Sequence, residues 1–446
     1  MKAATHLTNE GNLLAAWYQA VHRQLPWRST RDPYSIWISE TMLQQTRVET
    51  VIPYYEAFMS KYPAVDDLAA ADFEDVAKLW QGLGYYSRAR NLHRAAKVVM
   101  TEFGGAIPSS EAEIRSLPGI GPYTAGAVLS IAFDEPVPAV DGNVLRVMAR
   151  FLGIEAPIET SAVKQEITAK VEQWLHLGKP SILTQALMEL GATVCTPRAP
   201  ECPRCPVQGN CVAFKNGSQS RLPVRKPKQA KRCVDVYALW YERNGHVLMH
   251  RRSEEGLLAG MWELPAVEYP GNPRSSGKLQ VRTTENEEKL PVEVESKLMT
   301  LFEQVRDSEV VDHRSFTVRE LGANSPQSPE YSVLLQTGSD RGDVSKGAES
   351  SLYAFARIAE ERHLFTHIDW RVQVLRPVGL EDMGAERAKK TTSMRGLPTS
   401  PDPWKIESKQ VYAMGQQFRW VPVEKIENLV LPRVYEKLLS RILGNS

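Results

Sequence analysis

The sequence predicts a protein of two domains, in which an all-α domain precedes a smaller mixed α/β domain. The chain has 446 residues, which is more than one ordinary hydrophobic core organises. Its first two hundred residues carry apolar side chains at three-to-four spacing, whereas the part beyond Cys211 contains a hairpin signal and period-two runs. We therefore expect domains at 1–213 and 233–446, joined by a linker at 214–232.

Eight segments of the N-terminal part are predicted as helices. In each, apolar residues recur at helical spacing, and Pro or Gly stands in the gaps between segments. The predicted helices are residues 11–25, 32–44, 47–61, 85–103, 123–133, 141–152, 161–176 and 179–194. Pro33 and Pro122 stand at helix entries, where the missing N–H of proline costs little.

The predicted linker, residues 214–232, is strongly basic. It contains no acidic residue. Its basic residues are Lys215, Arg221, Arg225, Lys226, Lys228, Lys231 and Arg232. Such a segment is either a solvated tether or a strap that contacts phosphates, and the sequence favours neither interpretation.

The C-terminal part reads as strands with two helices. Residues 234–252 predict strand, turn and strand around Asn244-Gly245, which is a strong hairpin turn. Residues 363–375 alternate with period two and predict a further strand, and helices are expected at 293–305 and 432–442. Two polar stretches, about 306–350 and 377–409, are expected to be long loops or inserted segments.

Composition sets the class of protein. Hydrophobic residues make up 42% and charged residues 24%, a balance typical of soluble globular proteins. No run approaches 18 apolar residues and the N-terminus lacks a secretory signal, so we expect neither a membrane span nor export. A cytoplasmic monomer is expected, associated with the nucleoid if the source is bacterial. The net charge of +1 neither implies nor excludes a nucleic-acid partner.

Four of the five cysteines lie within seventeen residues, which predicts a metal site. They are Cys195, Cys202, Cys205 and Cys211. Prolines between them favour turns that aim the sulfurs inward. Spacing alone favours zinc held by four thiolates, with an iron–sulfur cluster as the alternative and a chance grouping without metal as the third interpretation. No upstream His-x-Glu supports a zinc deaminase site.

Residues 117–126, LPGIGPYTAG, predict a tight hairpin between two helices. Gly119 and Gly121 permit backbone conformations that other residues avoid, so main-chain groups can approach a phosphate at the start of the next helix. A helix–hairpin–helix of this kind binds the DNA backbone without reading sequence. The alternative is an ordinary glycine-rich turn, but the full string is more specific than a lone Gly-x-Gly.

Two carboxylates are candidates for chemistry. Glu40 shares a predicted helix face with Ile36 and Leu43, so its carboxyl group points where the helix is otherwise apolar. Burial there would raise its pKa and keep it protonated near neutral pH. Asp141 precedes the helix LRVMARFL, where a simple N-cap is the alternative to a chemical role. For Glu40 the alternative is a carboxylate paired with an arginine of another helix.

Taken together, the two acids suggest a division of labour. One would be a protonated donor, and the other an ionised group that stabilises developing positive charge. This pairing suits cleavage of a bond between a sugar and a heteroatom through an oxocarbenium-like transition state.

Several strings of this sequence resemble the adenine DNA glycosylases of the MutY family. They are LPW (25–27), SETMLQQT (39–46), LWQGLGYYSRARNL (79–92), LPGIGPYTAGAVLSIAF (from 117), VDGNV (140–144) and the four-cysteine run. The resemblance covers about residues 8–213. Residues 233–446 are similar to the C-terminal domain of that family, which is related in fold to Nudix hydrolases, through LLAGMWELP (257–265) and HLFTHIDW (363–370). The Nudix catalytic pattern is absent from the sequence, so Nudix hydrolase activity is not expected.

The resemblance implies an all-α helix–hairpin–helix glycosylase domain, with the hairpin at about 113–133, followed by a smaller Nudix-like α/β domain. It implies a 4Fe-4S cluster at the four cysteines, in the loop 195–211, in place of zinc. It also implies removal of adenine mispaired with 8-oxoguanine or guanine in double-stranded DNA. Glu40 takes the position of the catalytic acid and Asp141 that of the carboxylate supporting the sugar cation. Tyr123 and Asn143 take those of neighbouring groups that position them.

Further positions follow from the same resemblance. Those on the side of the adenine pocket are Arg28, Leu43 and Glu189. Those that fill the opened stack and contact the lesion base are Gln45 and either Tyr85 or Tyr86. Those in the C-terminal loop that senses 8-oxoguanine are Phe365, Thr366 and His367. That loop often carries Ser where Thr366 stands, and the hydroxyl is retained here.

Tyr123 also bears on the reaction type. The related endonuclease III family has a lysine at this place in the hairpin, which forms a Schiff base, and a tyrosine cannot. We therefore expect hydrolysis without a strong strand-cleaving step. The basic residues expected on the DNA-facing surface are Arg88, Arg90, Arg94, Lys97, Arg198, Arg204 and the linker.

Overall fold

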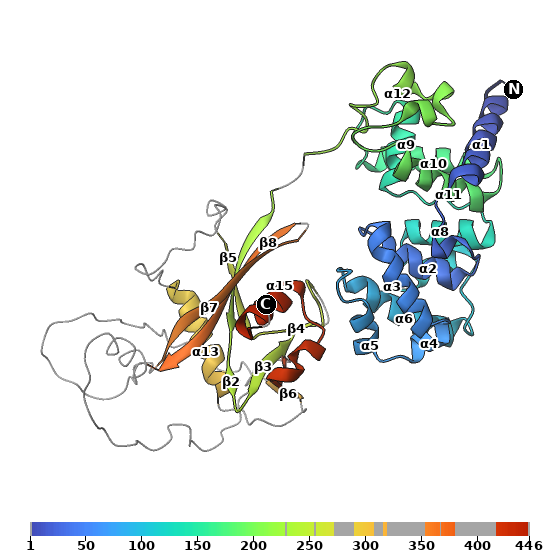
Figure 1. The fold of residues 1–446 in the computed structure, drawn as a ribbon. Coiled ribbons are helices and arrows are strands. Elements are labelled where there is room, and N and C mark those ends of the chain that lie inside the picture. The colour runs from blue at the N-terminus through green and yellow to red at the C-terminus, as the bar shows by residue number, and fades with distance from the viewer. Residues whose placement is uncertain are drawn as a thin grey trace, which may run out of the picture. The chain divides into compact units, whose positions relative to one another are not determined.

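The computed structural model describes residues 2–227, 230–253, 256–271, 290–306, 315–318, 353–365, 367–379 and 416–444. The chain divides into two compact units, Met1–Lys228 and Gln229–Ser446, and each is described by itself (Figure 1). None of the described helices combines the length and the apolarity needed to cross a lipid bilayer.

The first unit is helical, and all eight helices predicted from the sequence are present. They are α1 (Lys2–Val21), α2 (Pro33–Leu43), α3 (Val48–Lys61), α6 (Ser87–Glu102), α8 (Pro122–Phe133), α9 (Gly142–Leu152), α10 (Ser161–Leu175) and α11 (Pro180–Thr193). The ends of α1 were predicted poorly, since that helix begins well before residue 11 and stops at Val21. Pro33, Pro122 and Pro180 each open a helix, as the sequence indicates for the first two.

Four short helices were not predicted from the sequence. They are α4 (Val65–Ala70), α5 (Phe73–Leu79), α7 (Glu111–Ser116) and α12 (Val212–Lys215). A helical period is recognised over windows of 11 to 18 residues, and none of these helices is that long. Single turns of 3-10 helix lie at Pro26–Arg28, Cys202–Arg204 and Gln208–Asn210.

Two hydrophobic cores organise the helical unit. One is built from the side chains of α2 to α8 and includes Ile38 and Val128, and the other from α1 and α9 to α11 and includes Leu14 and Val147. The corresponding two groups of helices are visible in Figure 1. Met188 of α11 packs against both cores. The two predicted carboxylates are therefore carried by helices of different cores, Glu40 by α2 of the first core and Asp141 by the start of α9 of the second.

The basic segment 214–232 is not a free linker over most of its length. Leu222 is buried, and its carbonyl oxygen accepts a hydrogen bond from Arg150 Nε at 2.8 Å. The amide of Ile158 donates to the carbonyl oxygen of Val224, and the amide of Lys226 donates to the Glu159 carboxylate. The first unit accordingly extends past the predicted boundary at 213, and the basic residues up to 227 are attached to it.

The second unit contains two sheets. The strands are β1 (Arg232–Leu239), β2 (Glu242–Arg243), β3 (His246–Arg251), β4 (Trp262–Glu263), β5 (Ala266–Pro270), β6 (Ser315–Val318), β7 (Tyr353–Leu364), β8 (Ile368–Gly379) and β9 (Gln416–Pro422). One sheet has the order β5-β1-β8-β7, in which β1 and β8 are parallel and the other pairs antiparallel. The other has the order β2-β3-β9-β6, with β4 paired to β3.

The central strand β1 is buried on both faces. Its residues Val234, Val236 and Ala238 pack with helix α15 (Arg433–Ile442) in one core, while Tyr237 packs with helix α13 (Val292–Arg306) in another. The helices expected at 293–305 and 432–442 are thus confirmed. The Asn244-Gly245 turn is confirmed too, because Arg243 pairs with His246 and both turn residues have positive φ.

The single strand predicted at 363–375 is wrong. The chain reverses there, so that β7 ends at Leu364 and β8 begins at Ile368, and the two strands pair antiparallel. The amide of Phe365 donates to the Ile368 carbonyl oxygen at 2.8 Å and closes the turn. Alternation of apolar side chains continues through a tight turn, so it cannot distinguish one strand from two. The polar stretches 306–350 and 377–409 lie largely outside the described residues, apart from β6 and the ends of α13 and β8.

Candidate active site

Glu40 lies on a helix that is buried on every side. Residues 34–42 of α2 are all buried, so the single apolar face proposed from the sequence understates the burial. The Glu40 side chain is 5% exposed, and Tyr123 Oη donates to its Oε2 at 2.5 Å. Tyr123 stands in the first turn of α8, directly after the glycine hairpin. The partner of Glu40 is therefore a hydroxyl group, not the arginine considered as an alternative.

Burial sets the protonation of Glu40. It raises the pKa of the carboxyl group to about 7. The Tyr123 hydrogen bond opposes this rise, the negative charge of Asp141 adds to it, and the positive charge of Arg28 opposes it. At neutral pH the group is thus close to half protonated, as a general acid requires.

Asp141 has the capping role that the sequence allowed. Its Oδ1 accepts hydrogen bonds from the amides of Asn143 at 2.9 Å and Val144 at 2.7 Å at the start of α9. Its Oδ2 accepts from the Asn143 side-chain amide at 2.8 Å. Burial raises the pKa of Asp141, while these bonds and the charge of Arg146 oppose the rise. The capping role is compatible with a chemical role, because a carboxylate at the N-terminus of α9 keeps its negative charge.

Glu40, Tyr123 and Asp141 share one electrostatic environment. The negative charge of Asp141 contributes to raising the pKa of Glu40 and also that of Tyr123. Such an effect requires proximity, because the interaction between two charges falls with distance. The two predicted acids are thus electrostatically linked, Glu40 on α2 and Asp141 at the start of α9.

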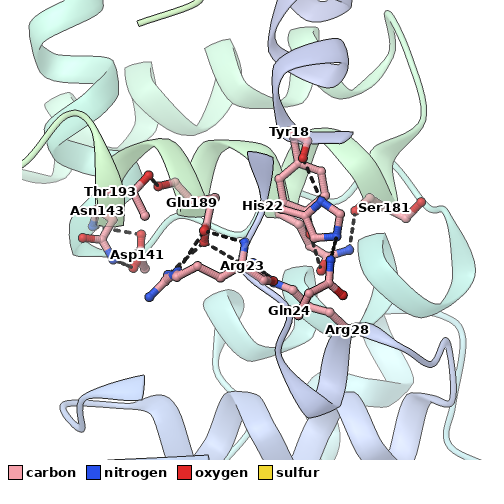
Figure 2. A network of polar contacts seen from close by, with 11 residues as sticks. Tyr18, His22, Arg23, Gln24, Arg28, Asp141, Asn143, Ser181, Glu189 and Thr193 are labelled. Atoms are coloured by element: carbon pink, nitrogen blue, oxygen red, sulfur yellow. Dashed lines mark hydrogen bonds and ion pairs between the residues drawn. The ribbon is translucent and has the colours of Figure 1, made fainter. Parts of the chain in front are cut away.

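Glu189 of α11 is held by two arginines. Arg23 Nε donates to its Oε1 at 2.8 Å and Arg28 Nη2 to its Oε2 at 2.7 Å, and the Glu189 side chain is 1% exposed. Figure 2 shows both side chains converging on the carboxylate. These bonds hold the pKa of Glu189 at about 2, against the effect of burial. The sequence analysis placed Glu189 and Arg28 together but missed Arg23.

A chain of hydrogen bonds runs from Asn143 to the cysteine loop. Arg146 Nη2 donates to Asn143 Oδ1 at 2.8 Å and to the Gly191 carbonyl oxygen at 2.7 Å. Arg146 Nε donates to the carbonyl oxygen of Cys195 at 2.8 Å. Gly191 permits this approach, because a Cβ there would lie 2.6 Å from the Cβ of Asn143. Sequence reasoning missed Arg146 and Gly191, although LRVMARFL places an arginine one turn after Asn143.

The four clustered cysteines line one cavity. Cys195, Cys202, Cys205 and Cys211 all contribute to its wall, and none forms a disulfide. Arg150 Nη1 reaches Cys195 Sγ at 3.3 Å. Burial raises the pKa of Cys205 to about 12. Among the described residues, no three His, Cys, Asp or Glu side chains converge tightly enough to hold one metal ion.

Two exposed residues stand at the tips of neighbouring loops. Gln45 follows α2 and Tyr85 precedes α6, both are exposed, and both have positive φ, 59° and 51°. We call Gln45 and Tyr85 the tip residues. Tyr86 is buried with 9% exposure, so of the two tyrosines considered from the sequence, Tyr85 is the one at the surface. Leu43 is half-buried and packs against the first core.

The glycine hairpin joins α7 to α8. Gly119 has a φ of +79°, and a Cβ there would lie 2.5 Å from the Cβ of Asn91 in α6. Gly121 is the N-cap residue of α8 and has no side-chain cap, so its neighbouring amides face outward from a helix N-terminus. Gly119 therefore has the left-handed conformation suggested by the sequence, whereas Gly121, with a φ of −93°, is in an extended conformation that other residues also adopt.

The candidate lesion-sensing loop is the β7–β8 turn of the second unit. Thr366 lies outside the described residues. Phe365 packs edge-on against Trp370 at 5.4 Å, and its carbonyl oxygen accepts from Lys231 Nζ at 2.7 Å. His367 is exposed, and its carbonyl oxygen accepts from the Arg232 amide. The end of the basic segment therefore fixes both sides of the turn.

One residue predicted for a basic surface is not on the surface. Arg88 is buried with 8% exposure. Arg94, Lys97, Arg198 and Arg204 are exposed, as predicted. Arg90 is half-buried, with its guanidinium 4.6 Å from the centre of the Phe73 ring. An arginine in the first turn of an amphipathic helix looks like a phosphate contact, but here it turns inward.

Several known proteins are similar in sequence to this chain. Residues 38–173 match the family model of the HhH-GPD superfamily base excision DNA repair proteins. The adenine DNA glycosylase of Mus musculus is 40% identical over 306 residues, which cover 57% of this chain and 59% of the mouse protein. That of Buchnera aphidicola subsp. Baizongia pistaciae (strain Bp) is 35% identical over 253 residues, covering 56% of this chain and 71% of the relative.

A solved structure of a thermostable thymine-DNA glycosylase is 29% identical, with a TM-score of 0.43, over 48% of this chain and 99% of that chain. The part of this chain that matches the mouse relative covers less than two thirds of that relative's length. The part that matches the Buchnera relative covers more than two thirds of that relative's length at above 30% identity. With a matched family model over the residues that carry Glu40, Tyr123 and Asp141, the chain belongs to the adenine DNA glycosylase family.

Proposed function

We propose that this protein removes adenine mispaired with 8-oxoguanine or guanine from double-stranded DNA and leaves the strand intact. The observation that carries the proposal is the buried Glu40, which accepts a hydrogen bond from Tyr123 and whose pKa is raised by burial and by the charge of Asp141. Membership of the adenine DNA glycosylase family supports adenine as the base and DNA as the polymer.

Access to the base is the first requirement. An adenine inside a duplex must be rotated out of the stack before any side chain can reach it. The exposed tip residues Gln45 and Tyr85 suit the place that the base leaves, because an aromatic ring and a planar amide can stack on neighbouring bases. The Gly119–Gly121 backbone suits the phosphates of the same strand.

Bond cleavage follows from the two carboxyl groups. Glu40 donates its proton to a ring nitrogen of the extruded adenine, and the bond between C1′ and the base breaks with its electron pair going to the base. The sugar becomes an oxocarbenium-like cation, which the Asp141 carboxylate stabilises. Water then attacks C1′ and returns a proton to Glu40. Tyr123 and the Asn143 amide orient the two carboxyl groups through the bonds described above.

Glu189 and Arg28 complete the proposed pocket for the base. The Glu189 carboxylate stays ionised because two arginines bond to it. The same bonds hold Arg28 in place, and the positive charge of Arg28 lowers the pKa of Glu40. A fixed cation near the acid keeps Glu40 from being permanently protonated, which lets it act as a base in the second half of the reaction.

Hydrolysis without strand cleavage is part of the proposal. A lyase step needs an amine that attacks C1′ and forms a Schiff base. Tyr123 stands in the hairpin facing Glu40 and offers a hydroxyl group there. The product is therefore free adenine and an intact strand with an abasic site.

The cysteine loop would hold a 4Fe-4S cluster. Cys195, Cys202, Cys205 and Cys211 line one cavity, and four thiolates around one space suit an iron–sulfur cluster. When bound, the cluster would link the four thiolates and so hold together the residues of this loop. The loop surface, with Arg198 and Arg204 exposed, is then available to the DNA backbone.

The second unit is proposed to be Nudix-like and to sense the base opposite adenine. Its β7–β8 turn presents Leu364, which is 56% exposed. The turn is stiffened by the Arg362–Asp369 ion pair at 2.6 Å. The exposed Leu364 and His367 on either side of this turn suit contact with a modified purine.

The experiment is release of adenine from synthetic duplexes under single-turnover conditions. Adenine is placed opposite 8-oxoguanine, guanine, cytosine or thymine, and parallel samples are treated with borohydride. We expect release opposite the first two bases only, with no covalent protein–DNA product. Abundant trapped product would refute the hydrolytic mechanism, and no release opposite either purine would refute the activity. The visible spectrum of the same preparation reports whether iron is bound.

A further inference from the structure

Arg88 is the most heavily bonded buried cation near the tip residues. Its Nη1 donates to the carbonyl oxygens of Thr41 and Met42 at 2.8 Å and of Gln44 at 2.6 Å. Its Nη2 contacts Thr46 Oγ1 at 3.3 Å and the carbonyl oxygens of Leu83 and Gly84 at 3.3 and 3.1 Å. One guanidinium group therefore bridges the end of α2 and the loop before α6.

Four of the six acceptors of Arg88 flank the two tip residues, and the other two lie in the last turn of α2. Gln44 and Thr46 stand on either side of Gln45, and Leu83 and Gly84 directly precede Tyr85. The amide of Arg88 also donates to the Tyr85 carbonyl oxygen at 2.9 Å. The guanidinium carbon lies 5.6 Å from the centre of the Tyr85 ring. In the two loops, the guanidinium therefore bonds only to residues that lie one or two positions from a tip residue.

Both tip residues have a backbone conformation that needs support. A left-handed φ is unfavourable for residues other than glycine, and it persists only where the surroundings fix it. Neither Gln45 nor Tyr85 can fix its own backbone by burial, because both side chains are exposed. The shared element beneath them is Arg88. We infer that Arg88 is a positioning residue, which holds Gln45 and Tyr85 together in the geometry required to fill the opened base stack.

Only an arginine meets this set of acceptors. The two terminal nitrogens of the Arg88 guanidinium, Nη1 and Nη2, stand apart in a planar fork and supply four N–H groups, while Nε has no partner in the described structure. A lysine ammonium has three donors at one point. Among the described residues, the oxygens that accept from Arg88 are all neutral, and burial lowers its pKa to about 10, so it is still charged at neutral pH. The charge strengthens each bond to a carbonyl oxygen, including those that the end of α2 leaves without helical partners.

This inference rests on the proposed function, and its test uses the full-length protein. Arg88→Lys keeps the charge and the stem but cannot reach all the acceptors. We expect adenine release from an adenine:8-oxoguanine duplex to fall about 10- to 100-fold under single-turnover conditions, because small misplacements of positioning groups have effects of that size. Arg31→Lys is the matched control, since Arg31 bonds to Asp134 and Ser181 and touches neither loop.

Non-additivity separates positioning from a general structural role. If Arg88 acts through the tip residues, then adding Arg88→Lys to Gln45→Ala/Tyr85→Ala lowers release no further than the double variant alone. A second readout is the fluorescence of 2-aminopurine beside the target adenine, in a Glu40→Gln background that stops excision. We expect Arg88→Lys to reduce the fluorescence rise that reports stack opening. Losses that multiply, or an unchanged fluorescence rise, overturn the inference.

A milder variant covers the case in which Arg88→Lys does not fold. Thr46→Val removes one acceptor beside Gln45 and keeps the side-chain shape. We expect it to show the same non-additivity with Gln45→Ala, at smaller amplitude, and additive losses would overturn the inference. If the unmodified protein releases no adenine, it is the proposed function that fails. If the unmodified protein is active and Arg88→Lys matches it, the inference about Arg88 fails alone.

Discussion

At the scale of single residues, the chemistry depends on where Glu40 is placed. A carboxyl group on a helix buried all round would be costly if it had to stay ionised. The neighbours of Glu40 divide into those that favour the acid, burial and the charge of Asp141, and those that favour the carboxylate, Tyr123 and Arg28. Their balance leaves a pKa of about 7, so the group can both give and accept a proton in one reaction cycle.

Replacing Tyr123 by Phe tests this balance. The hydrogen bond from Tyr123 lowers the pKa of Glu40, so removing it should raise that pKa further. Because a general acid works only while protonated, the alkaline decline of the excision rate should begin at a higher pH in Tyr123→Phe than in the unmodified protein. The measurement is the single-turnover rate of adenine release from about pH 6 to about pH 9, a range that includes the alkaline decline of the unmodified protein.

Tyr34→Phe is the control for this profile, because the Tyr34 hydroxyl donates to the Tyr62 carbonyl oxygen and does not contact Glu40. Its alkaline limb should stay in place. A limb that moves to lower pH in Tyr123→Phe, or does not move, would contradict the assignment of Glu40 as the acid.

Some residues of this site were predictable from the sequence, and others were not, for a physical reason. Glu40 and Asp141 stand next to apolar runs, so their unusual setting shows in the pattern of one segment. Arg23 and Arg146 stand among ordinary polar residues, and their roles arise only when α11 and the cysteine loop pack beside them. Arg88 was assigned to the surface because its charge is visible in the sequence and its inward direction is not.

At the scale of elements, the close contact between α9 and α11 sets the position of Asp141. The start of α9 carries Asp141 and Asn143, and Gly191 of α11 lies against Asn143. Helices pack this closely only where one of them has no side chain at the contact. The long helices were predictable from their period, whereas this contact was not, because it joins residues almost fifty positions apart.

Adding one methyl group at this contact tests its importance. In Gly191→Ala the new Cβ would lie 2.6 Å from the Cβ of Asn143, so the start of α9 must shift. We expect a loss of about 1–3 kcal/mol in the free energy of unfolding, typical of overpacking, together with slower adenine release. Chemical denaturation and single-turnover kinetics measure the two effects.

Gly11→Ala is the matched control for Gly191→Ala. Its new Cβ in α1 meets only Leu177, at 4.0 Å, and alanine in a helix is favoured over glycine by roughly 0.5–1 kcal/mol. It should be neutral or stabilising and leave the rate unchanged. A Gly191→Ala protein with normal stability and rate would show that the contact does not position Asp141.

At the scale of the whole molecule, the two units divide the proposed task. The helical unit Met1–Lys228 carries the acids, the hairpin, the tip residues and the cysteine loop, whereas Gln229–Ser446 carries the candidate sensor turn. The two-domain organisation was visible in the sequence as a change of period and composition. The attachment of residues 214–227 to the helical unit was not visible, because it depends on single bonds such as that from Arg150 to Leu222.

Replacing His367 by Ala tests whether the second unit contributes to substrate choice. We expect the preference for 8-oxoguanine over guanine opposite adenine to fall by about tenfold, the equivalent of one good hydrogen bond. The ratio of single-turnover rates on the two duplexes measures it. Arg243→Ala, on the β2–β3 hairpin of the same unit, is the control. An unchanged ratio in His367→Ala would remove His367 from the proposed lesion contact.

The most direct measurement compares the unmodified protein with Glu40→Gln on one adenine:8-oxoguanine duplex. Glutamine fills the same space and can accept the Tyr123 bond, but it has no proton to donate to the base. We predict that adenine release disappears in Glu40→Gln while affinity for the duplex stays nearly unchanged. Release at the unmodified rate, or an equal loss of release and affinity, would contradict the claim that a buried acid at residue 40 performs the excision.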